Sequence, residues 1–291
     1  MYERSVCAVV VTYHPASAMI ENLSGIASQT DGLVIVDNGS SPDEVTLLCK
    51  AGEALGFHMI ENETNLGIAA ALNQGIAWAK SKGCQWVILF DQDSQITAGF
   101  VRQLFSDWES RPDRDRIGSM HPRYIDPETG LETKVWRAKD GGPIISITSG
   151  ALMPIWIFDK LGGFAAEYFI DEVDTEYCYR IRAGGYLIAD SRDAILLHHA
   201  GHPKRIRLLG FSFAPTNHSP SRRYYMVRNQ IMVYRKYFRI FPLWILQLMN
   251  IRIREIIKCF LAEQNRTRKL RNSFLGVIDG LTSRMGKREG L

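Results

Sequence analysis

The chain of 291 residues is 46% hydrophobic and 23% charged, and its formal net charge is +4. This composition is typical of a globular protein and excludes a disordered or repetitive chain. The five cysteines are scattered and include no CxxC pair, which argues against a zinc site or a disulfide framework and favours a reducing cytoplasm. We therefore expect an ordinary folded protein with one large domain, or a domain plus an extension.

Charge is distributed unevenly along the chain. Residues 222–291 carry 16 Lys/Arg and 4 Asp/Glu, whereas residues 1–221 carry 19 and 27. We therefore predict an acidic domain at 1–221 and a basic, amphipathic helical extension at 222–291. Basic residues mixed with Trp, Phe, Leu and Ile are typical of a helix lying on an anionic membrane surface. Nucleic acid would also attract this charge, but no nucleic-acid-binding motif accompanies it.

No segment of the sequence has the pattern of a signal peptide or a membrane span. Residues 2–5, Tyr-Glu-Arg-Ser, lack the basic start of a secretory signal and are not followed by its apolar core. The apolar stretch at 240–249 is about half of the ~20 residues needed to cross a bilayer. We therefore expect neither export by that route nor a transmembrane helix.

Strand-like and helical patterns alternate through the first hundred residues. Strands are expected at 6–12, 33–36, 57–60 and 86–90, and helices at 16–28, 43–55 and 69–82. This alternation predicts an α/β fold, a mainly parallel sheet flanked by helices. Beyond residue 100 the pattern loosens, with further strands expected around 144–152 and at 194–197, and helices from 224 onward.

The expected strand at 86–90 runs directly into Asp91-Gln92-Asp93. Open α/β sheets bind ligands at the carboxyl ends of their strands. Alternate residues of an extended chain point the same way, so Asp91 and Asp93 can face one cation, and carboxylates suit Mg²⁺ or Mn²⁺. A nucleotide diphosphate is the natural partner for such a cation. The alternative is a turn rich in Asp and Ser after an ordinary strand.

Two other strand ends carry polar residues. The first strand ends at Thr12-Tyr13 without the GxGxxG of a dinucleotide fold, so NAD or FAD binding has no support. The second ends at Asp37-Asn38, where an acidic side chain suits a hydrogen bond to a base or a ribose hydroxyl. A turn residue before Asn-Gly is an equal alternative for Asp37.

The segment from Asn65 to Gly75 is rich in small residues. Gly67 would let the backbone approach a ligand closely, and Asn73 could reach a nucleotide from the helix. Taken alone, the segment is better explained as an Ala-rich helix preceded by a turn.

Taken together, these motifs resemble the family 2 inverting glycosyltransferases of the GT-A fold. The resemblance rests on VVVTYHP, VIVDNGS, NLGIAAALNQGI, DQDS and GGFAAEYFIDEVDTEYCYRIRAGGY, in this order over about two thirds of the chain. The forms FDQDS, FIDEVDTEYCYR and HSPSRRYYMVRN look most like bacterial rhamnosyltransferases that use dTDP-L-rhamnose. The resemblance implies a nucleotide-sugar half at about 1–100, with Thr12, Tyr13, Asp37, Asn38, Asn65, Gly67 and Asn73 around the donor, and an acceptor half at about 101–221.

An acidic cluster at 167–176 would supply the catalytic base. Inverting transfer needs one carboxylate to take the proton of the acceptor hydroxyl. By its distance from Arg180 and the following glycines, Asp174 matches the base of the resembled family, and Asp171 is the second candidate. Glu176 would contact the acceptor or hold Arg180. A solvated helix face is the alternative explanation of the cluster.

The resemblance also gives roles to a histidine group and to three arginines. The histidine group at 198–202 follows the strand expected at 194–197, and in the resembled family a histidine here often completes the metal site or touches the diphosphate, which favours His198 and then His199. Arg222, Arg223 and Arg228 would clamp the leaving diphosphate. The start of a basic, membrane-facing helix explains these arginines equally well.

The expected activity is transfer of L-rhamnose from dTDP-β-L-rhamnose, with inversion and with Mg²⁺ or Mn²⁺, to a hydroxyl of a lipid-linked saccharide in O-antigen-type synthesis. The expected location is the inner face of the bacterial plasma membrane, as a peripheral protein, with no nucleic-acid partner. A family 2 transferase with another donor is the first alternative. A haloacid-dehalogenase-type phosphatase fits less well, because its DxD belongs in the first strand and a Thr or Val would replace Gln95. A nucleotidyltransferase and an inactive membrane adaptor are further alternatives.

Overall fold

The computed structural model describes residues 5–17, 19–198, 206–208, 211–213 and 217–291. The chain forms two compact units. The first comprises Met1–Ala166 and Asp174–Ala200, and the second comprises Glu167–Val173 and Gly201–Leu291. The boundary predicted from charge, between residues 221 and 222, falls inside the second unit.

The first unit is built on a sheet with strand order β3-β2-β1-β4-β7-β6-β8-β5. Its strands are β1 (Val6–Thr12), β2 (Gly32–Asp37), β3 (His58–Glu61), β4 (Trp86–Asp91), β5 (Gln95–Ile96), β6 (Ile117–Ile125), β7 (Ala151–Pro154) and β8 (Leu187–Leu197). Strands β1 to β4 are mutually parallel, whereas β7 runs antiparallel to β4 and β6. The α/β prediction is confirmed, with a parallel first half and a mixed second half.

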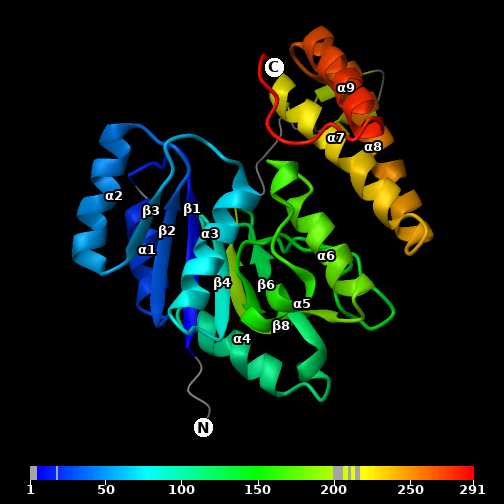
Figure 1. Cartoon of the computed structure of the whole chain (residues 1–291). Helices are drawn as coiled ribbons and strands as arrows, with labels where there is room; N and C mark the ends of the chain where they lie inside the picture. The colour runs from blue at the N-terminus through cyan, green and yellow to red at the C-terminus, as the bar shows by residue number, and fades with distance from the viewer. Residues whose placement is uncertain (1–4, 18, 199–205, 209–210, 214–216) are drawn as a thin grey trace. The chain divides into compact units, whose positions relative to one another are not determined.

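Helices cover both faces of this sheet (Figure 1). They are α1 (Met19–Ala27), α2 (Pro42–Leu55), α3 (Ile68–Ser81), α4 (Phe100–Glu109), α5 (Ile155–Leu161) and α6 (Val173–Ala183), with short 3₁₀ turns at Arg114–Arg116 and Ala166–Tyr168. Alternate side chains of β1 point toward opposite faces of the sheet. Val10 packs in the core with Leu23 of α1 and Leu104 of α4. Val9 faces α3, where a side chain at Gly75 would lie 2.3 Å from a Val9 methyl carbon.

Four elements from residue 100 onward differ from the sequence-based expectation. The strand predicted around 144–152 is wrong in its first part, because β7 begins only at Ala151 and Gly150 adopts a φ of +77°. Strand β6 and helix α4 were not predicted, and β8 extends seven residues before the expected start at Ala194. These strands are stabilised by pairing with distant segments, and local sequence patterns do not record such pairing.

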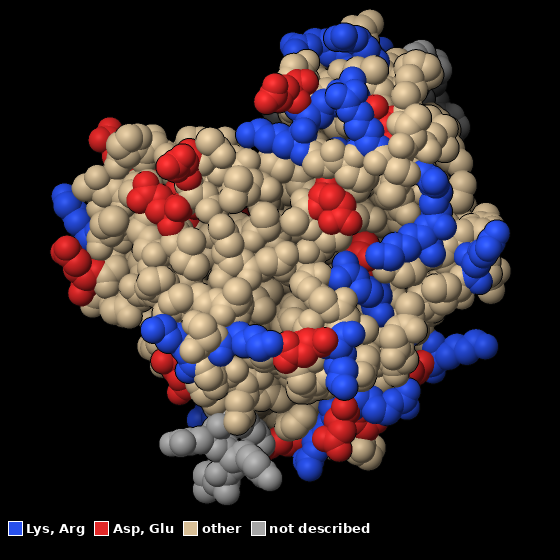
Figure 2. Space-filling model, in the orientation of Figure 1, with Lys and Arg blue, Asp and Glu red and all other residues tan. Residues whose placement is uncertain are grey.

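The second unit is mainly helical, as predicted. It contains the hairpin β9 (Ile206–Leu208) and β10 (Phe211–Phe213), followed by α7 (Pro220–Tyr237), α8 (Pro242–Ala262) and α9 (Arg266–Leu281). Gly276 and Gly280 let α9 approach α7 closely, since a side chain at Gly276 would lie 2.6 Å from the Tyr224 carbonyl oxygen. Blue Lys and Arg side chains predominate among the charges on the visible face of these helices (Figure 2). Within the described stretches, no helix is long and apolar enough to cross a bilayer.

Candidate active site

Polar residues from three neighbouring strands meet at one edge of the sheet. Strand β1 lies between β2 and β4, with Thr12 paired to Asp37 and Val11 paired to Asp91. The backbone N–H of Tyr13 donates to the Gln92 side-chain oxygen at 2.9 Å, which joins the ends of β1 and β4. The predicted grouping of these strand ends is therefore present in the fold.

Asp91 and Asp93 form a carboxylate pair at the end of β4. Asp91 is half-buried and Asp93 is exposed. Burial, together with the nearby Asp93 charge, raises the pKa of Asp91 to about 6. A cation beside this pair would favour the ionised form of Asp91, and carboxylate oxygens are the donors that Mg²⁺ and Mn²⁺ prefer. Among the described residues no group of three His, Cys, Asp or Glu side chains is suited to a metal, so a diphosphate would have to supply further oxygen ligands.

Asp37 is fully buried and organises the turn that follows β2. Its carboxylate accepts hydrogen bonds from the Thr12 hydroxyl at 2.8 Å and from the backbone N–H and hydroxyl of Ser40 at 2.9 and 2.6 Å. Asn38 donates to the Asn65 side-chain oxygen at 3.1 Å and accepts from the Leu66 N–H at 3.0 Å. Thr12, Asp37 and Asn38 therefore hold the turn after β2 in place, while Tyr13 is 46% exposed.

The segment after β3 is held against this turn. Asn65 accepts a hydrogen bond from the N–H of Gly67, which precedes α3 with a φ of +90°. Asn73 is engaged elsewhere, since its amide exchanges two 2.8 Å hydrogen bonds with the backbone N–H and carbonyl of Phe164. Asn73 therefore links α3 to residues 162–164, and these two hydrogen bonds explain its side chain without any contact to a nucleotide.

Asp174 lies in the first turn of α6, where its carboxylate accepts a 2.8 Å hydrogen bond from the N–H of Thr175. It is half-buried and lines a small cavity. The cavity is also lined by Ser119, His121, Ser146, Thr148, Ala151, Met153, Phe164, Tyr177, Cys178 and Ile181. The positive end of the helix dipole favours an ionised carboxylate at this position.

A buried polar network connects the β4 end with this cavity. The hydroxyls of Ser94 and Ser149 are 2.6 Å apart, and the Tyr124 hydroxyl donates to the Ser149 carbonyl at 3.0 Å. Tyr124 Oη lies 3.4 Å from Nδ1 of His121, whose other ring nitrogen is 3.0 Å from the Ser119 hydroxyl. Both Asp91 and Asp174 act electrostatically on Tyr124. The two carboxylate sites therefore share one packed framework, which sequence reasoning missed.

His121 is neutral within this framework. It is 3% exposed, and burial lowers its pKa to about 4. The neutral ring places one donor and one acceptor beside the cavity that contains Asp174. The sequence gives no sign of this role, because His121 sits in a segment that was not predicted as a strand.

Comparisons with known proteins decide the family. The model of "Glycosyl transferase family 2" matches residues 7–158. The chain belongs to glycosyl transferase family 2. It is 30% identical to a dTDP-rhamnosyl transferase, RfbF, of Shigella flexneri, over 95% of each protein. It is also 31% identical to the galactofuranosyltransferase GlfT1 of Mycolicibacterium smegmatis, over 70% of this chain and 74% of that protein.

Solved structures share the fold of this glycosyltransferase. The mannosyltransferase PcManGT of Pyrobaculum calidifontis, in complex with GDP-Man and Mn²⁺, superposes with a TM-score of 0.61 at 18% identity, covering 97% of this chain and 76% of that one. TarS 1–349 of S. aureus with UDP-GlcNAc gives a TM-score of 0.55 at 12% identity, covering 96% and 73%. The family assignment includes the β1, β2 and β4 ends, since Thr12, Asp37, Asp91 and Asp93 lie within the matched residues.

In the glycosyltransferase, His198 directly follows the last residue of β8. The antiparallel pairing of β5 with β8 sets Gln95 opposite Leu197, so the next residue, His198, comes across from the chain that follows Asp93. The His198 ring centroid lies 6.2 Å from that of Tyr124. His199 lies outside the described residues. Among the described residues His198 forms no three-residue metal group with Asp91 and Asp93, so its metal role stays a prediction.

The second unit of the glycosyltransferase contains Asp171 and the three predicted arginines. Asp171 pairs with Arg222, with oxygen-to-nitrogen distances of 3.1 to 3.3 Å. Arg223 is buried against Glu263 at 2.5 Å. Arg228 is fully buried and donates to the carbonyls of Gly286 and Tyr168. Arg223 and Arg228 thus stabilise the second unit, while Arg222 is half-exposed and its role at the diphosphate stays a prediction.

Glu176 is the remaining predicted site residue. It is fully buried, and its carboxylate pairs with Arg180, whose Nε donates at 3.1 Å. Arg180 in turn donates to the carbonyl of Gly163 at 2.6 Å. The interpretation of Glu176 as the residue that holds Arg180 is confirmed.

Proposed function

We propose that this glycosyltransferase moves L-rhamnose from dTDP-β-L-rhamnose to a hydroxyl group of a lipid-linked saccharide, with inversion at the anomeric carbon. The observation that carries the donor is the 30% identity to a dTDP-rhamnosyl transferase along 95% of both proteins. The geometry adds a carboxylate pair at the strand ends and a separate carboxylate, Asp174, beside a cavity. The O-antigen-type setting of the acceptor is part of the proposal.

The donor diphosphate would lie at the ends of β1 and β4. Asp91 and Asp93 would hold Mg²⁺ or Mn²⁺ together with oxygens of the diphosphate. The metal, when bound, would neutralise charge on the leaving dTDP. Tyr13 would contact the nucleoside, next to the turn that Thr12, Asp37 and Asn38 hold in place.

Asp174 would act as the general base. It would take the proton of the acceptor hydroxyl while that oxygen forms a bond to the anomeric carbon of rhamnose. The bond from this carbon to the diphosphate oxygen breaks on the opposite side, and the electron pair leaves with dTDP. Attack opposite the leaving group inverts the β-configuration of the donor to an α-linkage.

A galactofuranosyltransferase is the second candidate function. It is favoured by the 31% identity to GlfT1 over 70% of this chain. Both candidates would use the same strand-end carboxylates. They would differ in the residues that contact the sugar and the nucleobase of the donor.

The second unit supports peripheral membrane binding as part of the proposal. Helix α8 exposes Leu243, Leu246, Ile253 and Ile257 by 77%, 50%, 55% and 50%. Exposed apolar residues on a strongly basic unit fit an anionic lipid surface, where lipid-linked saccharides reside. We therefore propose the cytoplasmic face of the bacterial plasma membrane as its location.

The function is tested by transfer of label. Radiolabelled dTDP-rhamnose is incubated with the protein, Mn²⁺ and bacterial membranes that contain lipid-linked saccharides, and the organic extract is counted. Label in the lipid fraction with the wild type, and none with Asp93→Asn, is the expected result. Labelling from UDP-galactofuranose alone would establish the second candidate instead.

A further inference from the structure

A cavity lies on the first unit at the edge of the sheet opposite the carboxylates. It has a volume of about 440 Å³ and is lined by Gln85, Trp86, Trp108, Arg114, Asp115, Ile117 and Trp156. Trp86 is the first residue of β4 and Asp91 is the last. Five residues of extended strand span about 17 Å, so this cavity is separate from the donor site.

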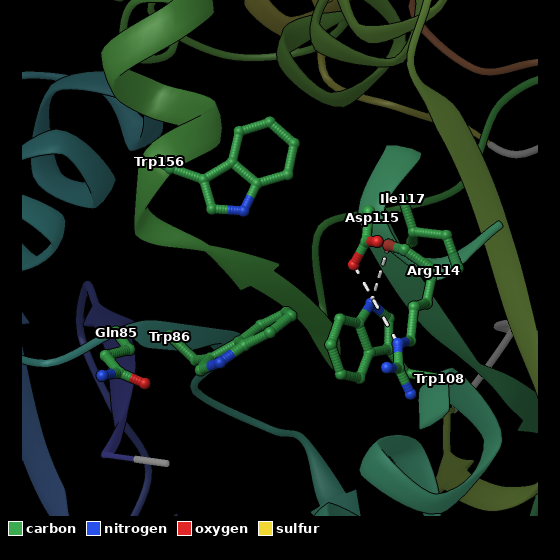
Figure 3. Close-up of a pocket in the computed structure, with 7 residues that line it drawn as sticks. All are labelled: Gln85, Trp86, Trp108, Arg114, Asp115, Ile117 and Trp156. Atoms are coloured by element: carbon green, nitrogen blue, oxygen red, sulfur yellow. Dashed lines mark hydrogen bonds and ion pairs between the residues drawn. The ribbon is translucent and has the colours of Figure 1, made fainter. Parts of the chain in front are cut away.

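Three indole rings from different elements form its walls. The Trp86 and Trp108 rings lie 5.1 Å apart at 76°, so their planes make a corner. Figure 3 shows the Trp156 indole projecting from α5 across the cavity from these two rings. Each ring is fixed by a neighbour, because Trp156 packs on Tyr186 at 5.2 Å and the Trp108 indole N–H donates to the Arg114 carbonyl at 3.1 Å. The cavity is therefore preformed.

Its polar groups suit a neutral ligand with hydroxyl groups. The side chains of Arg114 and Asp115 approach within 4.0 Å and are 47% and 91% exposed, so the rim offers donors and acceptors with no net charge. Gln85 is exposed at the other side of the cavity, next to Trp86 (Figure 3), and offers both in one side chain. A phosphorylated ligand would bind less favourably, because the Asp115 carboxylate lies beside the Arg114 guanidinium and would repel a phosphate group.

We propose that this cavity is a second saccharide-binding site that takes a pyranose ring of a neutral glycan. The apolar C–H face of a pyranose fits against an indole face, and its edge of hydroxyls matches the rim of Gln85, Arg114 and Asp115. A cavity of this size lies within the range of small-molecule sites and accommodates one or two sugar rings. The site would hold a glycan at a distance from the transfer reaction.

The test is saturation-transfer NMR of the full chain with the methyl glycosides of α-L-rhamnose, glucose, galactose and N-acetylglucosamine, in the presence of saturating dTDP. At least one glycoside should bind while dTDP occupies the donor site. Trp156→Ala should weaken that binding by about tenfold, because it removes one aromatic wall. Trp136→Ala is the matched control, since Trp136 is 37% exposed and lies outside the cavity lining.

Arg114→Ala provides a second variant that removes a rim side chain, which packs 5.6 Å over the Trp108 ring, and leaves all three indoles in the chain. It should also weaken glycoside binding, and thermal unfolding checks that both variants fold. The proposal is overturned if the wild type binds no glycoside, if dTDP displaces the bound glycoside, or if a folded Trp156→Ala and Arg114→Ala bind as tightly as Trp136→Ala.

Discussion

Asp171 and Asp174 are three residues apart, yet their surroundings differ. Asp171 has a φ of +64° and is paired with Arg222, whereas Asp174 begins a helix and lines a cavity with neutral His121. The Asp171 carboxylate is held in an ion pair with the Arg222 guanidinium, whereas a base must accept a proton during the reaction. The environment of Asp174 therefore fits the role of base better.

Asp174→Asn should retain dTDP binding and lose turnover by a factor of about 10² to 10⁴, the usual contribution of a general base. Asp171→Asn should reduce turnover much less, because it removes an ion pair and no proton acceptor. Release of dTDP in the presence of acceptor membranes, with dTDP affinity measured by calorimetry, checks both variants. Near-normal turnover of Asp174→Asn would refute the assignment.

His121 makes the protein sensitive to acid. Its pKa is lowered from 6.5 to about 4 in the folded state, so the unfolded chain binds a proton first as pH falls through this window. The contribution of neutral His121 to the unfolding free energy is therefore fully present above about pH 6.5 and is lost as the pH falls below that value. Relative to His121→Asn, the wild type should lose about 2 kcal/mol of unfolding free energy between pH 7 and pH 5. Urea unfolding measures this, with exposed His14→Asn as control; equal pH dependence of wild type and His121→Asn would contradict it.

At the scale of elements, the turn after β2 and the segment before α3 must touch. Gly39 has a φ of +88°, and a side chain there would lie 2.7 Å from the backbone carbon of Thr64. Gly39→Ala should cost about 2 kcal/mol more unfolding free energy than Gly56→Ala, because Gly56 has a similar φ of +72° but open space around it. Gly39→Ala should also weaken dTDP binding. Equal stability of the two variants in urea unfolding would show that the close approach is unimportant.

The segment Phe169–Glu172 depends on helix α7. Phe169, Asp171 and Glu172 have positive φ angles, and the buried Asn229 amide nitrogen donates to the carbonyls of Tyr168, Ile170 and Asp171 at 2.7 to 2.9 Å. Backbone strain of this kind persists only where surrounding contacts enforce it.

Asn229→Ala should therefore lower the unfolding free energy by about 3 kcal/mol, since it removes the buried amide that donates to the carbonyls of Ile170 and Asp171. Chemical denaturation checks this, with the exposed Asn250→Ala as control. A loss no larger than that of the control would show that Asn229 does not hold the segment.

How far the sequence predicts these elements depends on how local their causes are. Strand β1 and helix α3 follow from local apolar patterns, and the DxD motif marks a strand end by itself. Strand β6 mixes Ser, His, Pro and Arg with apolar residues and forms through pairing with β7 and β8. The network from Ser94 to Ser149 and Tyr124 joins distant segments, so no local pattern could reveal it. Likewise, the burial of Arg228 required the packing of helices to be known.

At the scale of the whole molecule, the basic second unit is expected to bind anionic membranes. Replacing Leu243, Ile253 and Ile257 together by Ser should reduce co-sedimentation with anionic vesicles by about tenfold or more, because exposed apolar area is removed. Leu131→Ser, also at an exposed position, is the control in the first unit. A wild type that fails to co-sediment even at low salt would contradict membrane binding.

Donor selectivity is the most direct test of the proposed activity. Calorimetric titrations compare dTDP-β-L-rhamnose with UDP-galactofuranose, UDP-glucose, UDP-galactose and GDP-mannose, each with and without Mn²⁺ or Mg²⁺. We predict tightest binding of dTDP-β-L-rhamnose, strengthened by the metal in the wild type and not in Asp93→Asn. Tighter binding of another sugar nucleotide, or binding that the metal does not affect, would contradict the assignment of this chain as a metal-dependent rhamnosyltransferase.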